Sequence, residues 1–248
     1  MTRTKRRTLV AGLSLPGNAV SALPDDYYLE VYSRTLPPGF PRPTRGAIAD
    51  VRSDEGDERV RTFHQLGAVE SEVLLPGQNK FRSKVLLNEE FKYESFRREI
   101  LDEPYQIVHV ASHGYFDGEV ENSWIMTHDE LIDLGELSEL FKPKEFSDNP
   151  VDLLVLSACE TAEGNDLAPL GLSGVALTSG ARSVIGSLWN VSDEPTELLM
   201  QDFYKSLAQP RVAKASALRA AQLNSLRRDD VVSHPHFWSA FVLMGNWQ

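Results

Sequence analysis

One histidine and one cysteine of this chain each lie two residues after a strongly apolar segment. His113 comes shortly after residues 106–111 (QIVHVA), and Cys159, the only cysteine, comes shortly after residues 151–157 (VDLLVLS). A thiolate is a strong nucleophile, but a free thiol, with a pKa of about 8.5, is mostly protonated at neutral pH. A neighbouring imidazole lowers that pKa or takes the proton during attack. The pair therefore predicts nucleophilic chemistry, provided that the fold brings the two side chains together.

The two apolar segments have the composition of strands that are buried on both faces of a sheet. A third such segment follows at residues 183–188. Helical periodicity lies between and after these segments, and strands that alternate with helices indicate an α/β fold with a mostly parallel sheet covered on both faces. Active sites of such sheets lie just beyond the carboxyl ends of the strands, where His113 and Cys159 are expected.

Further elements follow from local signals. Asp133 and Asp193 are expected to be helix N-caps, and Gly180 a left-handed C-cap. The predicted helices are 63–74 (stopped by Pro76–Gly77), 89–102, 133–141, 171–179, 193–207 and 212–226, and the further predicted strands are 8–13, 27–32, 84–87, 124–126 and 241–244.

Gly114, directly after the histidine, would let a substrate backbone approach closely and leave its N–H open to an oxyanion. The N–H of Cys159 is the candidate for a second donor. Against these functional interpretations, a single cysteine is commonly a buried structural thiol. His109 lies four residues before His113. Four residues of a strand span about 13 Å, too far for one metal ion, so His109 is expected to be a hydrogen-bonded core residue.

Composition excludes several classes of protein. The 248 residues include 25 Lys and Arg against 36 Asp and Glu, and the net charge of −11 argues against direct nucleic-acid binding. One cysteine cannot build a disulfide framework or a multi-cysteine metal site. The sequence contains neither G-x-G-x-x-G nor a Walker A motif, which argues against nucleotide cofactors. No cofactor and no metal is expected. The basic start of the chain reads as a lead-in to strand 8–13, not a signal peptide, and no apolar run reaches membrane-spanning length, so a cytoplasmic location is expected.

Several longer stretches resemble the CHAT domain family of caspase-like, clan CD cysteine peptidases. They occur in family order and read IVHVASHGYF (107–116), ENSWIM (121–126), LLVLSACETAEG (153–164), GLSGVALTSGARSVIGSLWNVSDEPTELLMQDFY (171–204), SALRAAQLNSL (216–226) and HPHFWSAFVLMGNW (234–247). The resemblance implies a caspase–haemoglobinase-like α/β/α sandwich at residues 63–248, with residues 1–62 supplying a strand and a Pro-rich insertion. His113 and Cys159 fall on the family's catalytic dyad. Their order and their spacing of 46 residues fit caspase-type peptidases, in which the histidine lies about 50 residues upstream.

The resemblance also implies where a substrate binds. A strand like Ser187–Asn190 (Ser187, Leu188, Trp189 and Asn190) pairs with the substrate backbone in similar enzymes. Glu160, Asp166, Asp193 and Glu194 are candidates for the S1 pocket, and a basic or neutral P1 residue is expected.

The resemblance implies a peptidase held inactive until a protein partner or signal acts in trans, in prokaryotic defence or cell death. Its substrate would be a protein, with a pore-forming effector as one family-level possibility. The alternative is a catalytically silent CHAT module that binds a partner without cleaving it.

Overall fold

The computed structural model describes residues 6–14, 17–19, 66–116, 123–145, 150–157, 160–161, 180–189 and 191–248. Its centre is a six-stranded sheet in the order β10-β9-β7-β3-β1-β2, in which only the edge strand β10 is antiparallel to its neighbour. The strands are β1 (Arg7–Gly12), β2 (Arg82–Leu87), β3 (Ile107–Ala111), β7 (Leu153–Leu156), β9 (Ser183–Ser187) and β10 (Phe241–Gly245). The predicted mostly parallel α/β fold is confirmed.

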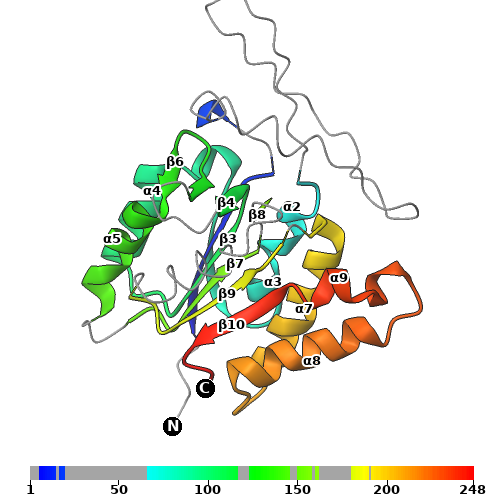
Figure 1. Cartoon of the computed structure of the whole chain (residues 1–248). Helices are drawn as coiled ribbons and strands as arrows, with labels where there is room; N and C mark the ends of the chain where they lie inside the picture. Colours follow the sequence, from blue (N-terminus) through cyan, green and yellow to red (C-terminus); the bar gives the residue numbers. More distant parts are fainter. Residues whose placement is uncertain are drawn as a thin grey trace, which may run out of the picture.

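Helices cover both faces of this sheet (Figure 1). One layer contains α4 (Tyr93–Asp102) and α5 (Leu134–Glu145). The other contains α2 (Val69–Glu72), α3 (Leu75–Gln78), α7 (Asp193–Leu207), α8 (Lys214–Leu226) and α9 (Pro235–Trp238). In the described ranges no helix is both long enough and apolar enough to cross a membrane.

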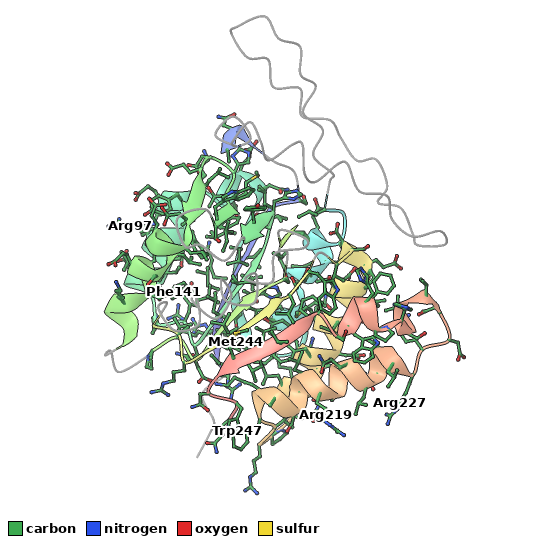
Figure 2. The ribbon with its side chains drawn as sticks, in the orientation of Figure 1. Arg97, Phe141, Arg219, Arg227, Met244 and Trp247 are labelled. Atoms are coloured by element: carbon green, nitrogen blue, oxygen red, sulfur yellow. The ribbon has the colours of Figure 1, made fainter. Side chains whose placement is uncertain are left out.

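The strands are apolar on both faces because each face contributes to a different core. Along β7, Leu154 and Leu156 pack in the core beneath α4 and α5, whereas Leu153 and Val155 pack in the core beneath α7 and α8. Phe141 of α5 is fully buried in the first core, while Arg219 and Arg227 point outward from α8 into solvent (Figure 2). This double burial is the reason that β3, β7 and β9 read as continuous apolar runs in the sequence.

A second, smaller sheet lies beyond the carboxyl ends of the central strands. It has four strands in the order β6-β5-β4-β8, namely β4 (Gly114–Phe116), β5 (Trp124–Met126), β6 (Leu131–Asp133) and β8 (Glu160–Thr161). Strand β4 continues the chain after β3, and β8 continues it after β7. The sequence predicted β5 but not the small sheet, because two- and three-residue strands have no periodicity to detect.

Two predicted helix boundaries are wrong. The predicted helix 63–74 is, within the described residues, the single turn α2, and Pro76–Gly77 does not stop it but lies inside the next short helix, α3. Pro76 fits there because a helix tolerates proline in its first turn, where the missing N–H has no intrahelical acceptor. Asp193 is not an N-cap: Ser192 occupies that position with an extended backbone, and Asp193 is the first helical residue.

The prediction that Asp133 is a helix N-cap is confirmed. The Asp133 carboxylate accepts from the N–H of Glu136 at 2.8 Å, and the Glu136 side chain accepts in return from the N–H of Asp133. This is a reciprocal capping box at the start of α5. Gly180 has a left-handed φ of +66°, but its role as the C-cap of helix 171–179 stays a prediction. The predicted strand 27–32 and helix 171–179 lie outside the described residues.

Candidate active site

His113 lies in the short connection between β3 and β4. It is 8% exposed, and its backbone carbonyl accepts from the N–H of Met126 in β5 at 2.8 Å. The neighbouring Ser112 hydroxyl donates to the Met126 carbonyl at 2.5 Å. Both contacts hold the turn that carries His113 against the small sheet, so the backbone of this residue is fixed on both sides.

Cys159 itself lies outside the described residues, but the chain on each side of it is described. Before it, β7 pairs in parallel with β3, and the N–H of Ser157 donates to the carbonyl of Val110 at 3.0 Å. After it, β8 pairs in parallel with β4, with Glu160 opposite Tyr115. The segments that lead into and out of Cys159 therefore run beside the segments that lead into and out of His113.

Gly114, the candidate oxyanion donor, is the first residue of β4 and pairs with Ile125 of β5. Backbone groups of successive residues in a strand point to opposite sides. Because the carbonyl of His113 points to β5, the N–H of Gly114 points to the other side of the strand, where β8 lies. This is the side from which the chain segment containing Cys159 enters the small sheet.

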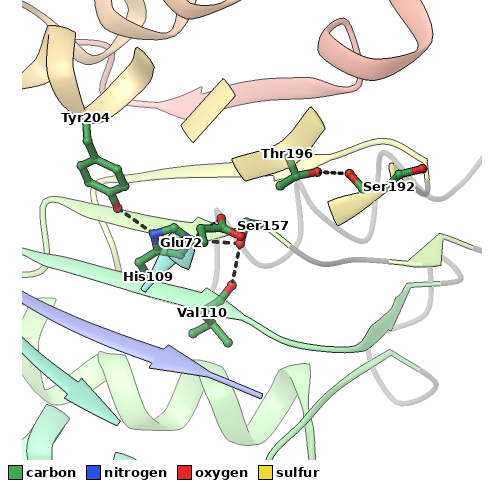
Figure 3. A network of polar contacts seen from close by, with 7 residues as sticks. All are labelled: Glu72, His109, Val110, Ser157, Ser192, Thr196 and Tyr204. Atoms are coloured by element: carbon green, nitrogen blue, oxygen red, sulfur yellow. Dashed lines mark hydrogen bonds and ion pairs between the residues drawn. The ribbon is translucent and has the colours of Figure 1, made fainter. Parts of the chain in front are cut away.

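A buried polar network lies beneath this turn, on the α7 face of the sheet. His109 is completely buried, and its two ring nitrogens contact three side chains from three other elements (Figure 3). Nε2 lies 3.1 Å from Oε1 of Glu72 and 2.9 Å from Oγ of Ser157, and Nδ1 lies 2.9 Å from the hydroxyl of Tyr204. The prediction that His109 is a hydrogen-bonded core residue is confirmed. The sequence did not identify Glu72 or Tyr204 as its partners.

Gly12, at the carboxyl end of β1, lets α2 approach closely enough for Glu72 to reach His109. A Cβ atom at position 12 would lie 2.5 Å from Cγ1 of Val73 and 2.8 Å from Cγ1 of Val69. Real side chains do not approach so closely, so any larger residue would push α2 away from the sheet. The glycine is thus a sequence signal for the close packing of α2.

Asp193 and Glu197, on the first two turns of α7, lie close enough to Glu72 to be affected by its charge. Burial, together with the negative charge of Glu72, raises the pKa of Asp193 from 3.8 to about 7, although the N–H of Gly67 donates to its carboxyl. Burial and the charges of Glu72 and Glu194 also raise the pKa of Glu197. This corner of the molecule therefore collects acids without an equal number of cations among its described neighbours.

Three further predicted substrate residues, Ser187, Leu188 and Trp189, lie at or just after the end of β9. Ser187 is 4% exposed, and its hydroxyl has no hydrogen-bond partner within the described part of the chain. The N–H of Leu188 donates to the carbonyl of Ala240, and the indole N–H of Trp189 donates to the carbonyl of His236 at 2.8 Å. Leu188 therefore directs its backbone N–H toward the C-terminal segment. Asn190, Asp166 and the side chain of Glu160 lie outside the described residues.

The described residues contain no group of three or more His, Cys, Asp or Glu side chains arranged as metal ligands.

Residues 16–246 match the model of the CHAT domain family. This chain belongs to the CHAT domain family. The match begins within the Pro-rich segment, upstream of the stretches in which the sequence motifs were recognised. Two curated relatives of this CHAT domain are the Tetratricopeptide repeat protein 28 of Mus musculus, 32% identical over 98 residues, and that of Homo sapiens, 30% identical over 99 residues. Each alignment covers 39% of this chain but only 4% of the relative.

The CHAT domain is also similar in structure to gingipain R (RGPB), an Arg-specific cysteine proteinase. The TM-score is 0.55 at 8% identity, and the match covers 97% of this chain and 46% of gingipain R. At this identity the likeness shows a shared caspase-like fold. Family and fold together show that this CHAT domain has a caspase-like architecture.

Proposed function

We propose that this CHAT domain is a cysteine endopeptidase that uses His113 and Cys159. The Cys159 sulfur attacks the scissile carbonyl, and the thiol proton passes to His113, which then gives it to the leaving amine. Water hydrolyses the resulting thioester, with His113 taking a proton from the water and returning it to the departing thiolate. The N–H groups of Gly114 and Cys159 are our candidates for the donors that stabilise the oxyanion.

One observation carries this proposal. Strands β3 and β7 pair just before the two residues, and β4 and β8 pair just after them. Two chain segments that are in register on both sides of a short gap have little freedom to separate within it. This pairing supports a close approach of His113 and Cys159 at the carboxyl edge of the sheet, where α/β folds carry their active sites.

For the substrate we propose a protein chain with a basic or neutral residue at P1. The support is the accumulation of acids near the start of α7, where Asp193 is partly buried and Glu194 is exposed. Glu160 and Asp166 are further candidates from the sequence, and residues 187–190 are candidates for pairing with the substrate backbone. Gingipain R is specific for Arg, which is a property of that protein. This specificity is consistent with a basic P1 residue, but our proposal does not depend on it.

We further propose that an activating or regulatory protein acts in trans on this domain, in the cytoplasm, within a prokaryotic defence or cell-death pathway. A pore-forming or other effector protein is our candidate substrate. These proposals come from the family resemblance. The chain matches only 4% of the length of its curated relatives. The match to these relatives therefore gives no information about partners, substrates or pathway.

The test compares the wild-type protein with Cys159→Ala and His113→Ala on a peptide library and on candidate partner proteins. Loss of either dyad residue is expected to lower kcat/KM by about 10³-fold or more while substrate binding persists. Cleavage by Cys159→Ala at the wild-type rate would contradict the catalytic proposal, and cleavage after Asp would contradict the predicted P1 preference. The alternative, a non-cleaving interaction module, predicts that wild type and Cys159→Ala capture the same intact partner.

A further inference from the structure

The network around His109 joins four elements at one point of the sheet. Glu72 comes from α2, His109 from β3, Ser157 from the end of β7 and Tyr204 from α7. All four side chains are buried, with exposed fractions between 0% and 5%. Figure 3 shows the Glu72 carboxylate and the Ser157 hydroxyl on one side of the imidazole, and the Tyr204 hydroxyl on the other.

The donors and acceptors of the network form a consistent set. A carboxylate only accepts, so the contact with Glu72 places a proton on Nε2 of His109, and Ser157 Oγ accepts from the same N–H. The Ser157 hydroxyl is then free to donate onward to the Val110 carbonyl at 3.4 Å. Burial, with the charge of Glu72, raises the pKa of Tyr204 well above its ordinary value, so the phenol keeps its proton and donates it to Nδ1.

Both members of the dyad are attached to this network through a short length of backbone. His109 lies four residues before His113 on the same chain segment, and Ser157 lies two residues before Cys159. A contact between His109 and Ser157 therefore fixes the end of β3 relative to the end of β7. Glu72 and Tyr204 hold the same imidazole from the helical layer, so rotation of its ring is opposed from both sides.

Stability alone is a weak explanation for these groups. Burying a carboxylate and an imidazole costs desolvation energy, and well-packed apolar residues of similar volume often stabilise such a site as well or better. Asp193 and Glu197 lie close to the same carboxylate, and their raised pKa values are a further cost of its position. What the network adds, and apolar packing would not, is a directional link between two particular strand ends.

We propose that Glu72, His109, Ser157 and Tyr204 are positioning residues, which hold the ends of β3 and β7 so that His113 and Cys159 meet in a reactive geometry. The proposal rests on the proposed function, because it assumes that these two residues form a dyad. None of the four is proposed to touch the substrate.

The sequence offers a specific probe, because Cys159 is the only thiol. The rate of its alkylation by iodoacetamide, measured against pH under native conditions, reports the thiolate at this position without any substrate. Ser157→Ala removes the side-chain contact with His109 and leaves the backbone pairing of β3 with β7 in place. Ser183→Ala is the matched control, since the Ser183 hydroxyl makes a buried hydrogen bond to the carbonyl of Asp152 at the amino edge of the sheet.

We expect Ser157→Ala to lower the alkylation rate at pH 7 about tenfold and to move the midpoint of the pH profile upward, since a misplaced imidazole stabilises the thiolate less. Ser183→Ala should stay within about twofold of wild type, although urea unfolding should show a loss of stability in both variants. Glu72→Gln and Tyr204→Phe, which keep the shape of the side chain, should shift the profile in the same direction, and they test the proposal should Ser157→Ala fail to fold.

The outcomes distinguish failure of the proposed positioning role from failure of the proposed His113–Cys159 dyad on which it rests. If His113→Ala shifts the profile and the network variants do not, or if Ser183→Ala shifts it equally, the positioning role is overturned while the dyad stands. If His113→Ala leaves the profile unchanged, the dyad itself is wrong, and the positioning role is overturned with it.

Discussion

The charged side chains at the two edges of the central sheet have different neighbours. At the amino edge, charged groups meet opposite charges: the Lys214 ammonium, 1% exposed, lies 2.8 Å from the Asp152 carboxylate, and the Arg7 guanidinium lies 2.6 Å from Glu103. At the carboxyl edge the negative charge of Glu72 lies near two further acids, Asp193 and Glu197, and burial together with this charge raises the pKa of each.

This difference separates structural polar groups from functional ones. Paired charges at the amino edge satisfy each other and fasten α8 and β1 to the rest of the fold. Acids placed near one another, with raised pKa values, reduce stability, and such arrangements cluster at functional sites. The carboxyl edge also carries His113, and the buried hydroxyl of Ser187 at this edge has no partner within the described residues. The contrast therefore supports the proposal that the carboxyl edge is the functional one, and this support does not depend on any motif.

The largest effect on stability is expected at the amino edge, from Lys214→Met. The variant keeps most of the apolar stem but leaves Asp152 without its cation. Because Asp152 is 24% exposed, we expect a loss of about 2–3 kcal/mol in the free energy of unfolding, below the roughly 3–5 kcal/mol of a fully buried pair. Urea unfolding measures the loss.

The same variant tests whether the two edges are independent. Alkylation of Cys159 should stay within about twofold of wild type at every pH where the variant is folded, since distant sites without shared partners behave additively. A shifted profile would show that damage at the amino edge reaches the dyad, and the proposed division of roles would fail.

The carboxyl edge should give the opposite result at Asp193. Its pKa is raised to about 7, so between pH 4 and 7 the folded protein binds a proton that the unfolded chain releases, and stability falls as the pH rises through this range. Asp193→Asn removes the ionisation. We expect the variant to be more stable than wild type by about 1–2 kcal/mol at pH 8, and to match it within a few tenths at pH 4.

Unfolding in urea at pH 4, 6 and 8 measures this effect. The control is Asp202→Asn, an acid farther along α7 whose charge acts on Arg228. Equal effects of the two substitutions at pH 8 would mean that general helix electrostatics, not the environment of Asp193, is responsible. A gain in stability combined with a loss of cleavage after basic residues would be the trade-off expected of a functional acid.

Much of the fold could be predicted because its signals are local. Strands β3, β7 and β9 are apolar on both faces, and the capping pair Asp133 and Glu136 is visible as a short motif. Asp193 was misplaced by one residue because Ser192 and Asp193 are both good N-cap types. The strand order and the pairing of β4 with β8 depend on contacts between distant segments, for which the sequence contains no periodic signal.

The residues of the candidate site also differ in whether a local sequence signal predicts them. His113 and Cys159 could be found because each follows a buried strand and lies in a family motif. Glu72 could not, because it lies on a four-residue helix without periodicity, and its role depends on Gly12 allowing α2 to approach β1. Tyr204 lies on α7, where a tyrosine indicates only packing until the partner of its hydroxyl is known.

The smallest effect is expected from Asp133→Ala. This variant tests whether a residue that lies near the small sheet, but outside the His109 network, affects the dyad. Asp133 is the last residue of β6 and caps α5, on the carboxyl side of the molecule, but the described hydrogen bonds of its side chain are exposed and stay within the capping box. Asp133→Ala should therefore cost about 1 kcal/mol in urea unfolding, the usual value of an N-cap. The Cys159 alkylation profile should remain that of wild type, whereas Ser157→Ala shifts it. If Asp133→Ala shifts the profile as well, any loosening of the small sheet disturbs the dyad, and the specific role of the His109 network is lost.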